Sequence, residues 1–247
     1  MNSCKKITKG GVDMLYLLDT ANLKAIQDLT DYYPVSGVTT NPTIISHEKA
    51  DFETLISGIR SIIGKDRMLH VQATGKTCEE IVREALALNS FDKGNLYIKV
   101  PVSREGVKAI KVLKEKGIKV TATAIFTQQQ ALVCARAGAD FVAPYINRLD
   151  NIVSDGTGVA SDISHLFHLY NLPTKVLAAS FKNVEQVHKV SMAGIDAVTV
   201  NPELLESLLC HPLTTQAIAD FSADWASVYG KDADIADLLE NDISITA

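Results

Sequence analysis

Short apolar runs alternate with amphipathic stretches along most of the chain. The runs predict eight strands, at residues 15–19, 37–40, 68–72, 96–102, 119–126, 141–146, 175–181 and 197–200. The stretches between them predict helices at 22–29, 51–63, 77–88, 105–116, 128–137, 161–170 and 184–193, with a Gly-rich loop before the sixth. Parallel strands need crossover connections, and right-handed crossovers can close such a sheet. The expected fold class is therefore α/β, a single (β/α)8 TIM barrel with a C-terminal helical extension; an open doubly wound sheet is the alternative.

The chain carries no linker rich in Pro, Gly and Ser that would mark a boundary between domains. The expected division is an extended N-terminus at 1–13, the barrel at 14–212, and a C-terminal helix and tail at 213–247. Phe221, Trp225 and Tyr229 follow one another at intervals of four and form an aromatic stripe on one side of this helix. The stripe is expected to pack either on the barrel of its own chain or on a neighbouring subunit.

Composition and charge narrow the classes of partner. A chain of 247 residues, 47% of them hydrophobic, is long enough for a large core and fits a single barrel. The formal net charge is −5, with 24 Lys and Arg against 29 Asp and Glu, and the sequence has no basic block. This balance argues against nucleic acid and anionic membranes as partners. Small molecules are the expected partners.

The cellular compartment is predicted from what the sequence lacks. The N-terminal residues contain no apolar core of a secretory signal, and no stretch reaches the roughly 20 apolar residues of a membrane span. The four cysteines are widely spaced, without the C-x-x-C pair that would indicate zinc or redox chemistry: Cys4, Cys78, Cys134 and Cys210. We expect free thiols, a cytoplasmic protein, and neither a metal nor a cofactor.

Lys99 interrupts the apolar run of the fourth predicted strand, Leu96 to Val102. A barrel strand is buried on both faces, so an ammonium group there is costly. Burial lowers the pKa of a lysine and makes its amine a usable nucleophile toward a carbonyl. A lysine paired with a buried carboxylate, or one that extends to solvent at the strand end, would fit the same run.

Polar side chains recur at the carboxyl ends of the predicted strands, where barrel enzymes have their active sites. They are Asp19, Thr39, Thr40, Asn41, Gln72, Lys99, Thr121, Thr123, Tyr145, Asn147, Arg148 and Ser180. Singly, each has an ordinary interpretation as a helix cap, a strand former, a core aromatic or a surface charge. Their recurrence at the same end of one barrel favours a functional site.

These residue types suit a carbonyl substrate. Lys99 can attack a ketone to form a carbinolamine and then an iminium, which makes cleavage of the adjacent carbon–carbon bond feasible without a metal. The cleavage removes a hydroxyl proton, so an acid or base must lie within hydrogen-bond reach. Tyr145 is one candidate, and Gln72 and Thr123 could hold a water that relays the proton. Arg148 and Ser180 suit a phosphate group.

Ordered motifs between about Leu15 and Tyr229 resemble the short transaldolase family, especially its fructose-6-phosphate aldolase branch. They are residues 37–45 (GVTTNPTII), 97–101 (YIKVP), 143–148 (APYINR) and 178–181 (AASF). The resemblance implies a class I aldolase with Lys99 as the Schiff-base lysine and Arg148 as the phosphate ligand. It also implies that four residues bind the dihydroxyacetone part of the substrate or shape the pocket: Asp19, Thr39, Asn41 and Ser180.

Two positions bring the sequence nearer to the aldolase branch. The resemblance implies a glutamate in true transaldolases where this chain has Gln72, and a phenylalanine where it has Tyr145. Because Gln72 cannot act as an acid or base, the proton role moves to Tyr145. The resemblance further implies a homo-oligomer, a ring-shaped decamer in which the C-terminal helix reaches a neighbour. Three features depart from the branch: residues 151–159, Phe126, and the acidic residues after Asp232. They leave the preferred acceptor aldehyde undetermined.

Three functions follow as hypotheses. The first is reversible cleavage of fructose 6-phosphate to dihydroxyacetone and glyceraldehyde 3-phosphate. The second is transaldolase activity, which passes the dihydroxyacetone unit to erythrose 4-phosphate. The third, from another class, is a non-catalytic barrel that binds sugar phosphates.

Overall fold

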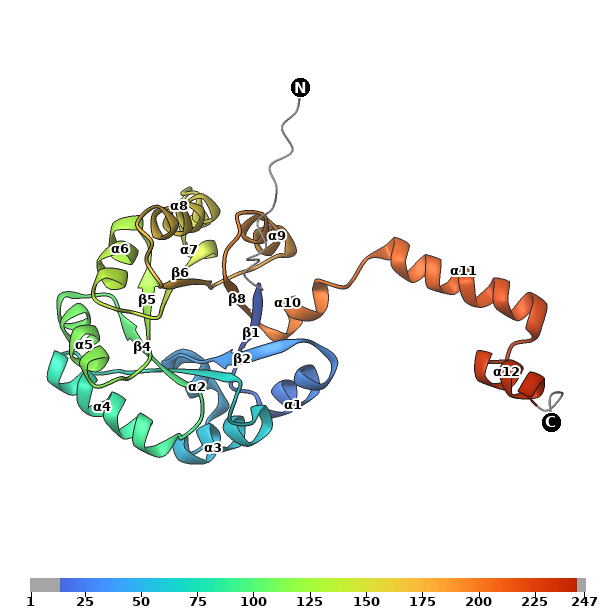
Figure 1. Ribbon diagram of the computed structural model, residues 1–247, viewed down its shortest axis with the longest axis horizontal. Helices are drawn as coiled ribbons and strands as arrows, with labels where there is room; N and C mark the ends of the chain where they lie inside the picture. The colour runs from blue at the N-terminus through green and yellow to red at the C-terminus, as the bar shows by residue number, and fades with distance from the viewer. Residues whose placement is uncertain (1–13, 244–247) are drawn as a thin grey trace, which may run out of the picture. The chain divides into compact units, whose positions relative to one another are not determined.

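The computed structural model describes residues 14–243, and its strands form a closed barrel of eight parallel strands (Figure 1). Each strand pairs with its neighbours in chain order, and β8 pairs with β1. The strands are β1 Leu15–Asp19, β2 Val35–Thr39, β3 Met68–Gln72, β4 Leu96–Pro101, β5 Val120–Ile125, β6 Phe141–Pro144, β7 Lys175–Ala178 and β8 Ala197–Val200. The barrel confirms the predicted fold class and excludes the open sheet.

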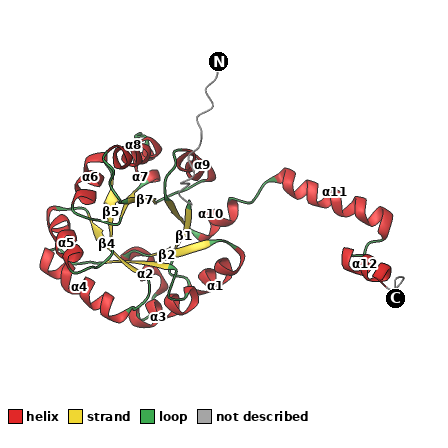
Figure 2. Ribbon diagram, in the orientation of Figure 1, coloured by secondary structure: helices red, strands yellow, loops and turns green. Residues whose placement is uncertain are grey.

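Helices surround the strands, as the outer ring of red ribbons around yellow arrows in Figure 2 shows. They are α1 Leu23–Tyr32, α2 Pro42–Glu48, α3 Phe52–Ile63, α4 Cys78–Phe91, α5 Arg104–Glu115, α6 Gln128–Arg136, α7 Ile146–Asp150, α8 Gly156–Leu169, α9 Val184–Met192 and α10 Pro202–Ser207. Side-chain caps begin many of them: the Thr77 hydroxyl accepts from Glu80 N at 3.2 Å, and Glu80 returns the contact in a capping box. Such caps explain why strand–helix boundaries were predictable to within a few residues.

The prediction of a Gly-rich loop before a helix at 161–170 is partly wrong. Helix α8 begins at Gly156, because the Asp155 carboxylate accepts a hydrogen bond from Gly158 N at 2.8 Å and caps the first turn. The sequence analysis also missed the short helices α2, α7 and α10, which have too few residues for a helical period to stand out. Strands β6 and β7 are shorter than predicted and end at Pro144 and Ala178.

The chain divides into two compact units, the first ending at Leu205 and the second beginning at Glu206. The second contains helices α11 Pro212–Tyr229 and α12 Ile235–Ile243. Trp225 fixes the turn between them, since its indole Nε1 donates to the Ala233 carbonyl at 2.8 Å. A division into domains at residues 212 and 213 stays a prediction, and the predicted N-terminal extension, with Cys4, lies outside the described residues.

Two other expectations concern free cysteine thiols and membrane-spanning segments. Cys78, Cys134 and Cys210 are free thiols, as predicted. No helix within residues 14–243 combines the length and the apolar character needed to cross a membrane.

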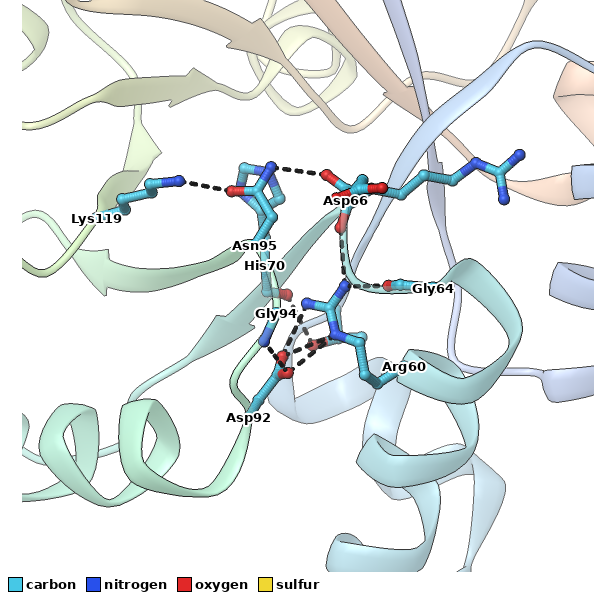
Figure 3. Close-up of polar contacts among 10 residues, drawn as sticks. Arg60, Gly64, Asp66, His70, Asp92, Gly94, Asn95 and Lys119 are labelled. Atoms are coloured by element: carbon cyan, nitrogen blue, oxygen red, sulfur yellow. Dashed lines mark hydrogen bonds and ion pairs between the residues drawn. The ribbon is translucent and has the colours of Figure 1, made fainter.

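A buried ion pair ties the loop before β4 to helix α3 (Figure 3). The Arg60 guanidinium donates to both carboxylate oxygens of Asp92 at 2.8–3.1 Å, and also to the Gly64 and Arg67 carbonyls. Only 13% of the Arg60 side chain and 3% of the Asp92 side chain are exposed. Gly94 is required beside them, because a Cβ there would lie 2.5 Å from Arg60 Cζ. The pair therefore fixes the start of the strand that carries Lys99.

Arg60→Met should strongly destabilise the barrel. The substitution leaves the buried Asp92 carboxylate without its charged partner, which costs about 3–5 kcal/mol in comparable sites. Urea unfolding followed by circular dichroism measures the loss. Lys108→Met is the control, because its ion pair with Glu79 is exposed and its loss should leave the midpoint unchanged. Equal midpoints for the two variants would contradict a structural role for the Arg60 pair.

Candidate active site

The residues that face the barrel interior follow from strand register. Five side chains from five different strands pack in one cluster: Leu17, Met68, Phe141, Leu177 and Ala197. Side chains of so many strands can meet only inside the barrel. Side chains alternate between faces along a strand, and residues paired in register share a face. By strand register, the residues that face the interior nearer the carboxyl ends of the strands are Asp19, Thr39, His70, Gln72, Lys99, Thr121 and Thr123. The predicted polar residues at these strand positions thus share one face.

Lys99 extends inward from β4 and is 5% exposed. Its Nζ donates to the Thr40 carbonyl at 2.7 Å, and none of the ion pairs between described residues includes it. Burial lowers the pKa of the Lys99 ammonium, and the Asp19 carboxylate opposes this effect. The structure thus excludes both ordinary interpretations of Lys99, a close ion pair and an exposed strand end. The arrangement favours an amine that can be deprotonated for nucleophilic attack.

A chain of hydroxyl groups holds the Asp19 carboxylate at the end of β1. The Thr39 hydroxyl donates to Asp19 Oδ1 at 2.7 Å and lies 2.7 Å from the Thr199 hydroxyl on β8. Thr39 and Thr199 are buried, and Asp19 is half-buried. These contacts orient one carboxylate toward the interior face that Lys99 shares.

Tyr145 directly follows β6 and forms a bridge with Ala179 after β7. Its hydroxyl is 3.1 Å from the hydroxyl of Thr123, and its ring contacts Phe126 edge-on at 5.5 Å between centroids. The exposed guanidinium of Arg148 lies over the same ring, 4.9 Å from its centroid. The structure therefore brings together three of the predicted residues, Thr123, Tyr145 and Arg148.

Two residues with left-handed backbones occur at this end of the barrel. Ala124 has φ 59°, and the pairing of β5 with β6 shifts register beside it. Ser180 has φ 63° and its carbonyl accepts from Asn147 N at 2.8 Å. Such conformations are strained for residues other than glycine and cluster at functional sites. They set the directions of Thr123 and Ser180 at the barrel mouth.

Asn41 and Gln72 lie apart from these contacts. The Asn41 side-chain oxygen accepts from Ile44 N at 3.0 Å and caps α2, so the helix-cap interpretation holds for this oxygen. Gln72 makes no side-chain hydrogen bond to another described residue, and it lines a cavity of about 520 Å³ with Phe52 and Phe91. Gln72 forms no hydrogen bond with Thr123 or Tyr145 in the structure.

The sequence analysis missed two residues of this interior, Thr199 and His70, and it named Thr40 only as a polar residue at the end of a strand. Thr199 was overlooked because the eighth run was short, although its alternation with Val198 and Val200 was a usable signal. Thr40 contacts Lys99 through its backbone carbonyl, which no side-chain pattern can reveal. His70 lies on the same strand as Gln72, two residues earlier, and was taken only as part of an apolar run.

Comparison with known proteins identifies the family of the chain. The sequence profile of a family described as transaldolase/fructose-6-phosphate aldolase matches residues 16–243. The chain belongs to this family. It is 40% identical over 213 residues to a probable fructose-6-phosphate aldolase of Streptococcus pneumoniae, covering 86% of this chain and 96% of that protein. It is 37% identical over 218 residues to a probable transaldolase of Lachnoclostridium phytofermentans, covering 88% and 100%.

Similarity to solved structures supports the fold of the chain and nothing further. A structure titled "Native KDPGal structure" superposes with a TM-score of 0.55 at 14% sequence identity, covering 81% of this chain and 85% of that one. As a member of the transaldolase/fructose-6-phosphate aldolase family, the chain is an enzyme of the aldolase and transaldolase type. Within residues 14–243, no three His, Cys, Asp or Glu side chains come together as metal ligands would.

Proposed function

We propose that the protein is a class I aldolase that reversibly cleaves fructose 6-phosphate to dihydroxyacetone and glyceraldehyde 3-phosphate. The observation that carries the proposal is Lys99, a buried amine in the barrel that forms no ion pair with a carboxylate of the described residues. Burial lowers its pKa, so more of the amine is unprotonated near neutral pH than for a solvated lysine. Sugar phosphates are the proposed partners, and the proposed chemistry uses no cofactor.

Covalent catalysis would begin with attack of Lys99 Nζ on the ketone carbon C2. The carbinolamine loses water to give an iminium, which draws electrons from the C3–C4 bond. That bond breaks as the C4 hydroxyl loses its proton, so glyceraldehyde 3-phosphate leaves and an enamine remains on Lys99. A proton then returns to C3 of the enamine, and hydrolysis of the new iminium releases dihydroxyacetone and the free amine.

Tyr145 is proposed to move the proton between the C4 hydroxyl and the enamine carbon. Its hydroxyl has Thr123 as partner at 3.1 Å, which supports a fixed orientation. A water between Thr123, Gln72 and Tyr145 would complete the relay. The amide of Gln72 has no other described partner and is available to hold such a water.

Arg148 and Ser180 are proposed to bind the phosphate group. Arg148 is exposed and forms no ion pair with another described residue, so its guanidinium is available for a bidentate contact. Asp19, Thr39 and Asn41 are proposed to hold the hydroxyl groups of the dihydroxyacetone part. Asn41 would do so through its amide nitrogen, since its oxygen caps α2.

Fructose 6-phosphate alone should release free dihydroxyacetone from the wild-type protein. Aldolase chemistry needs no acceptor aldehyde, so product should accumulate with the donor as sole substrate. Lys99→Met should release none, whereas Lys108→Met, an exposed lysine on α5, should behave as wild type. The measurement is enzymatic assay of dihydroxyacetone with time. Release only of a seven-carbon ketose phosphate, and only after erythrose 4-phosphate is added, would instead identify a transaldolase.

Tyr145→Phe should slow cleavage but leave iminium formation intact. Loss of an acid–base group costs about 10²–10⁴-fold in rate, whereas Lys99 does not need this hydroxyl to attack a ketone. Turnover of fructose 6-phosphate and borohydride trapping of dihydroxyacetone on the protein separate the two steps. Tyr170→Phe, a distant exposed tyrosine, is the control. Unchanged turnover in Tyr145→Phe would remove Tyr145 from the mechanism.

We also propose that the protein is a cytoplasmic homo-oligomer, and a decamer is the expected form. The support lies on α11, where Leu213, Ile218, Phe221 and Val228 are each more than half exposed. Ile218, Phe221 and Val228 recur at helical spacing and form one apolar face with Trp225. A face of this kind is stable when a second copy of the chain covers it.

Phe221→Ser should lower the sedimentation mass of the protein. The serine removes the central apolar group of the proposed interface, so subunits should dissociate at micromolar concentration. Gln216→Ser, which changes the polar face of the same helix, should leave the mass unchanged. A wild-type protein that sediments at the 26.7 kDa of one chain would contradict the oligomer.

A further inference from the structure

His70 is a buried titratable side chain that the proposed mechanism does not use. It is 0% exposed, its ring stacks on Tyr97 at 4.6 Å, and Phe141 contacts its edge. Its Nδ1 lies 2.9 Å from the Thr121 hydroxyl, but its Nε2 has no hydrogen-bond partner among residues 14–243. A buried polar atom without a partner is costly, and an ordered internal water is the usual solution.

The backbone brings Lys99 close to His70. Lys99 starts on β4, yet its Nζ reaches the Thr40 carbonyl beyond the end of β2, so the side chain crosses the intervening strand β3 inside the barrel. His70 lies on β3 with its side chain on the same interior face. Thr40 connects them directly, because its amide and hydroxyl both donate to the His70 carbonyl, at 2.9 and 3.0 Å.

The interior around His70 combines the rings of Tyr97 and Phe141 with hydroxyl-bearing side chains. Barrel interiors are commonly filled by Val, Ile and Leu. Here inward positions of β2, β5 and β8 hold Thr39, Thr121 and Thr199. Lys99 Nζ has three donors when protonated, and a single acceptor, the Thr40 carbonyl, is engaged. The His70 Nε2 and the Lys99 ammonium can therefore each form a further hydrogen bond, and both lie in the barrel interior.

We propose that His70 is a positioning residue for Lys99: its Nε2 binds an internal water that accepts a hydrogen bond from Lys99 Nζ. Either imidazole tautomer fits, since a water can accept from Nζ while it donates to Nε2 or accepts from it. The water would hold the amine in place and stabilise its ammonium form. The consequence for catalysis rests on the proposed function, whereas the water site does not.

The charges around the imidazole favour its neutral form. Burial, and then the Lys99 ammonium, lower the pKa of His70 well below its ordinary value. The titratable groups on the interior faces of the strands around it are Asp19 on β1, Tyr97 and Lys99 on β4, and Lys175 on β7, with Tyr145 directly after β6. The neighbouring interior residues of β2, β5 and β8 are the threonines Thr39, Thr121, Thr123 and Thr199.

The test is the pH dependence of Lys99 acetylation by acetic anhydride, read by peptide mass spectrometry without substrate. His70→Phe keeps a flat ring for Tyr97 but cannot bind the water, so the ammonium loses an acceptor. The labelling midpoint should fall by about one pH unit, giving about ten-fold faster labelling below both midpoints. An unchanged midpoint would mean that His70 only fills space, and a raised midpoint would mean that it carries a charge; either overturns the proposal.

Two variants calibrate the experiment. Tyr97→Phe removes a hydroxyl from the same aromatic stack and should leave the midpoint unchanged. Asp19→Asn removes the carboxylate that raises the pKa of Lys99, so its midpoint should fall and show that the assay responds. If His70→Phe does not fold, a high-resolution crystal structure of the wild-type protein decides, because a dry space at Nε2 overturns the proposal. The two proposals can fail separately. If the labelling midpoint shifts as expected but borohydride traps no adduct, the proposed function is contradicted and the water site is supported.

Discussion

The ammonium group of Lys99 inside an apolar barrel is the constraint on which the proposed chemistry depends. Burial makes the charged form costly, and the Thr40 carbonyl and the Asp19 carboxylate compensate for only part of that cost. An ion pair at contact distance would have fixed the proton on the amine and blocked attack on a ketone. The barrel instead lowers the pKa of Lys99 and places no described carboxylate at contact distance from its amine.

The rest of the interior supports this balance with hydroxyl groups. Thr39 and Thr199 orient Asp19 without adding charge, and Thr123 does the same for Tyr145. Below them, the Arg60–Asp92 pair fixes the loop before β4 and so sets the start of the strand that carries Lys99. Charge is thus concentrated at the barrel mouth and at the outer loops, while the layer beneath the amine is neutral.

The sequence predicted the barrel because a barrel depends on strand periodicity. Runs buried on two faces predicted the strands, and polar residues at their ends gave Lys99, Asp19 and Tyr145 as candidate site residues. Contacts made through the backbone or over long separations were not predictable. The Thr40 carbonyl has no side-chain signature, and Arg60 and Asp92 are 32 residues apart. The start of helix α8 at Gly156 was missed because a glycine-rich first turn resembles a loop until its Asp155 cap is known.

Family membership narrows the chemistry to aldol cleavage or transfer, and the covalent step is what remains to be measured. The most direct measurement is sodium borohydride reduction of the wild-type protein with dihydroxyacetone, followed by peptide mass spectrometry. The account predicts one adduct per chain, located on Lys99, with the mass of the reduced dihydroxyacetone unit. No adduct, or an adduct spread over exposed lysines with Lys99 unmodified, would contradict it.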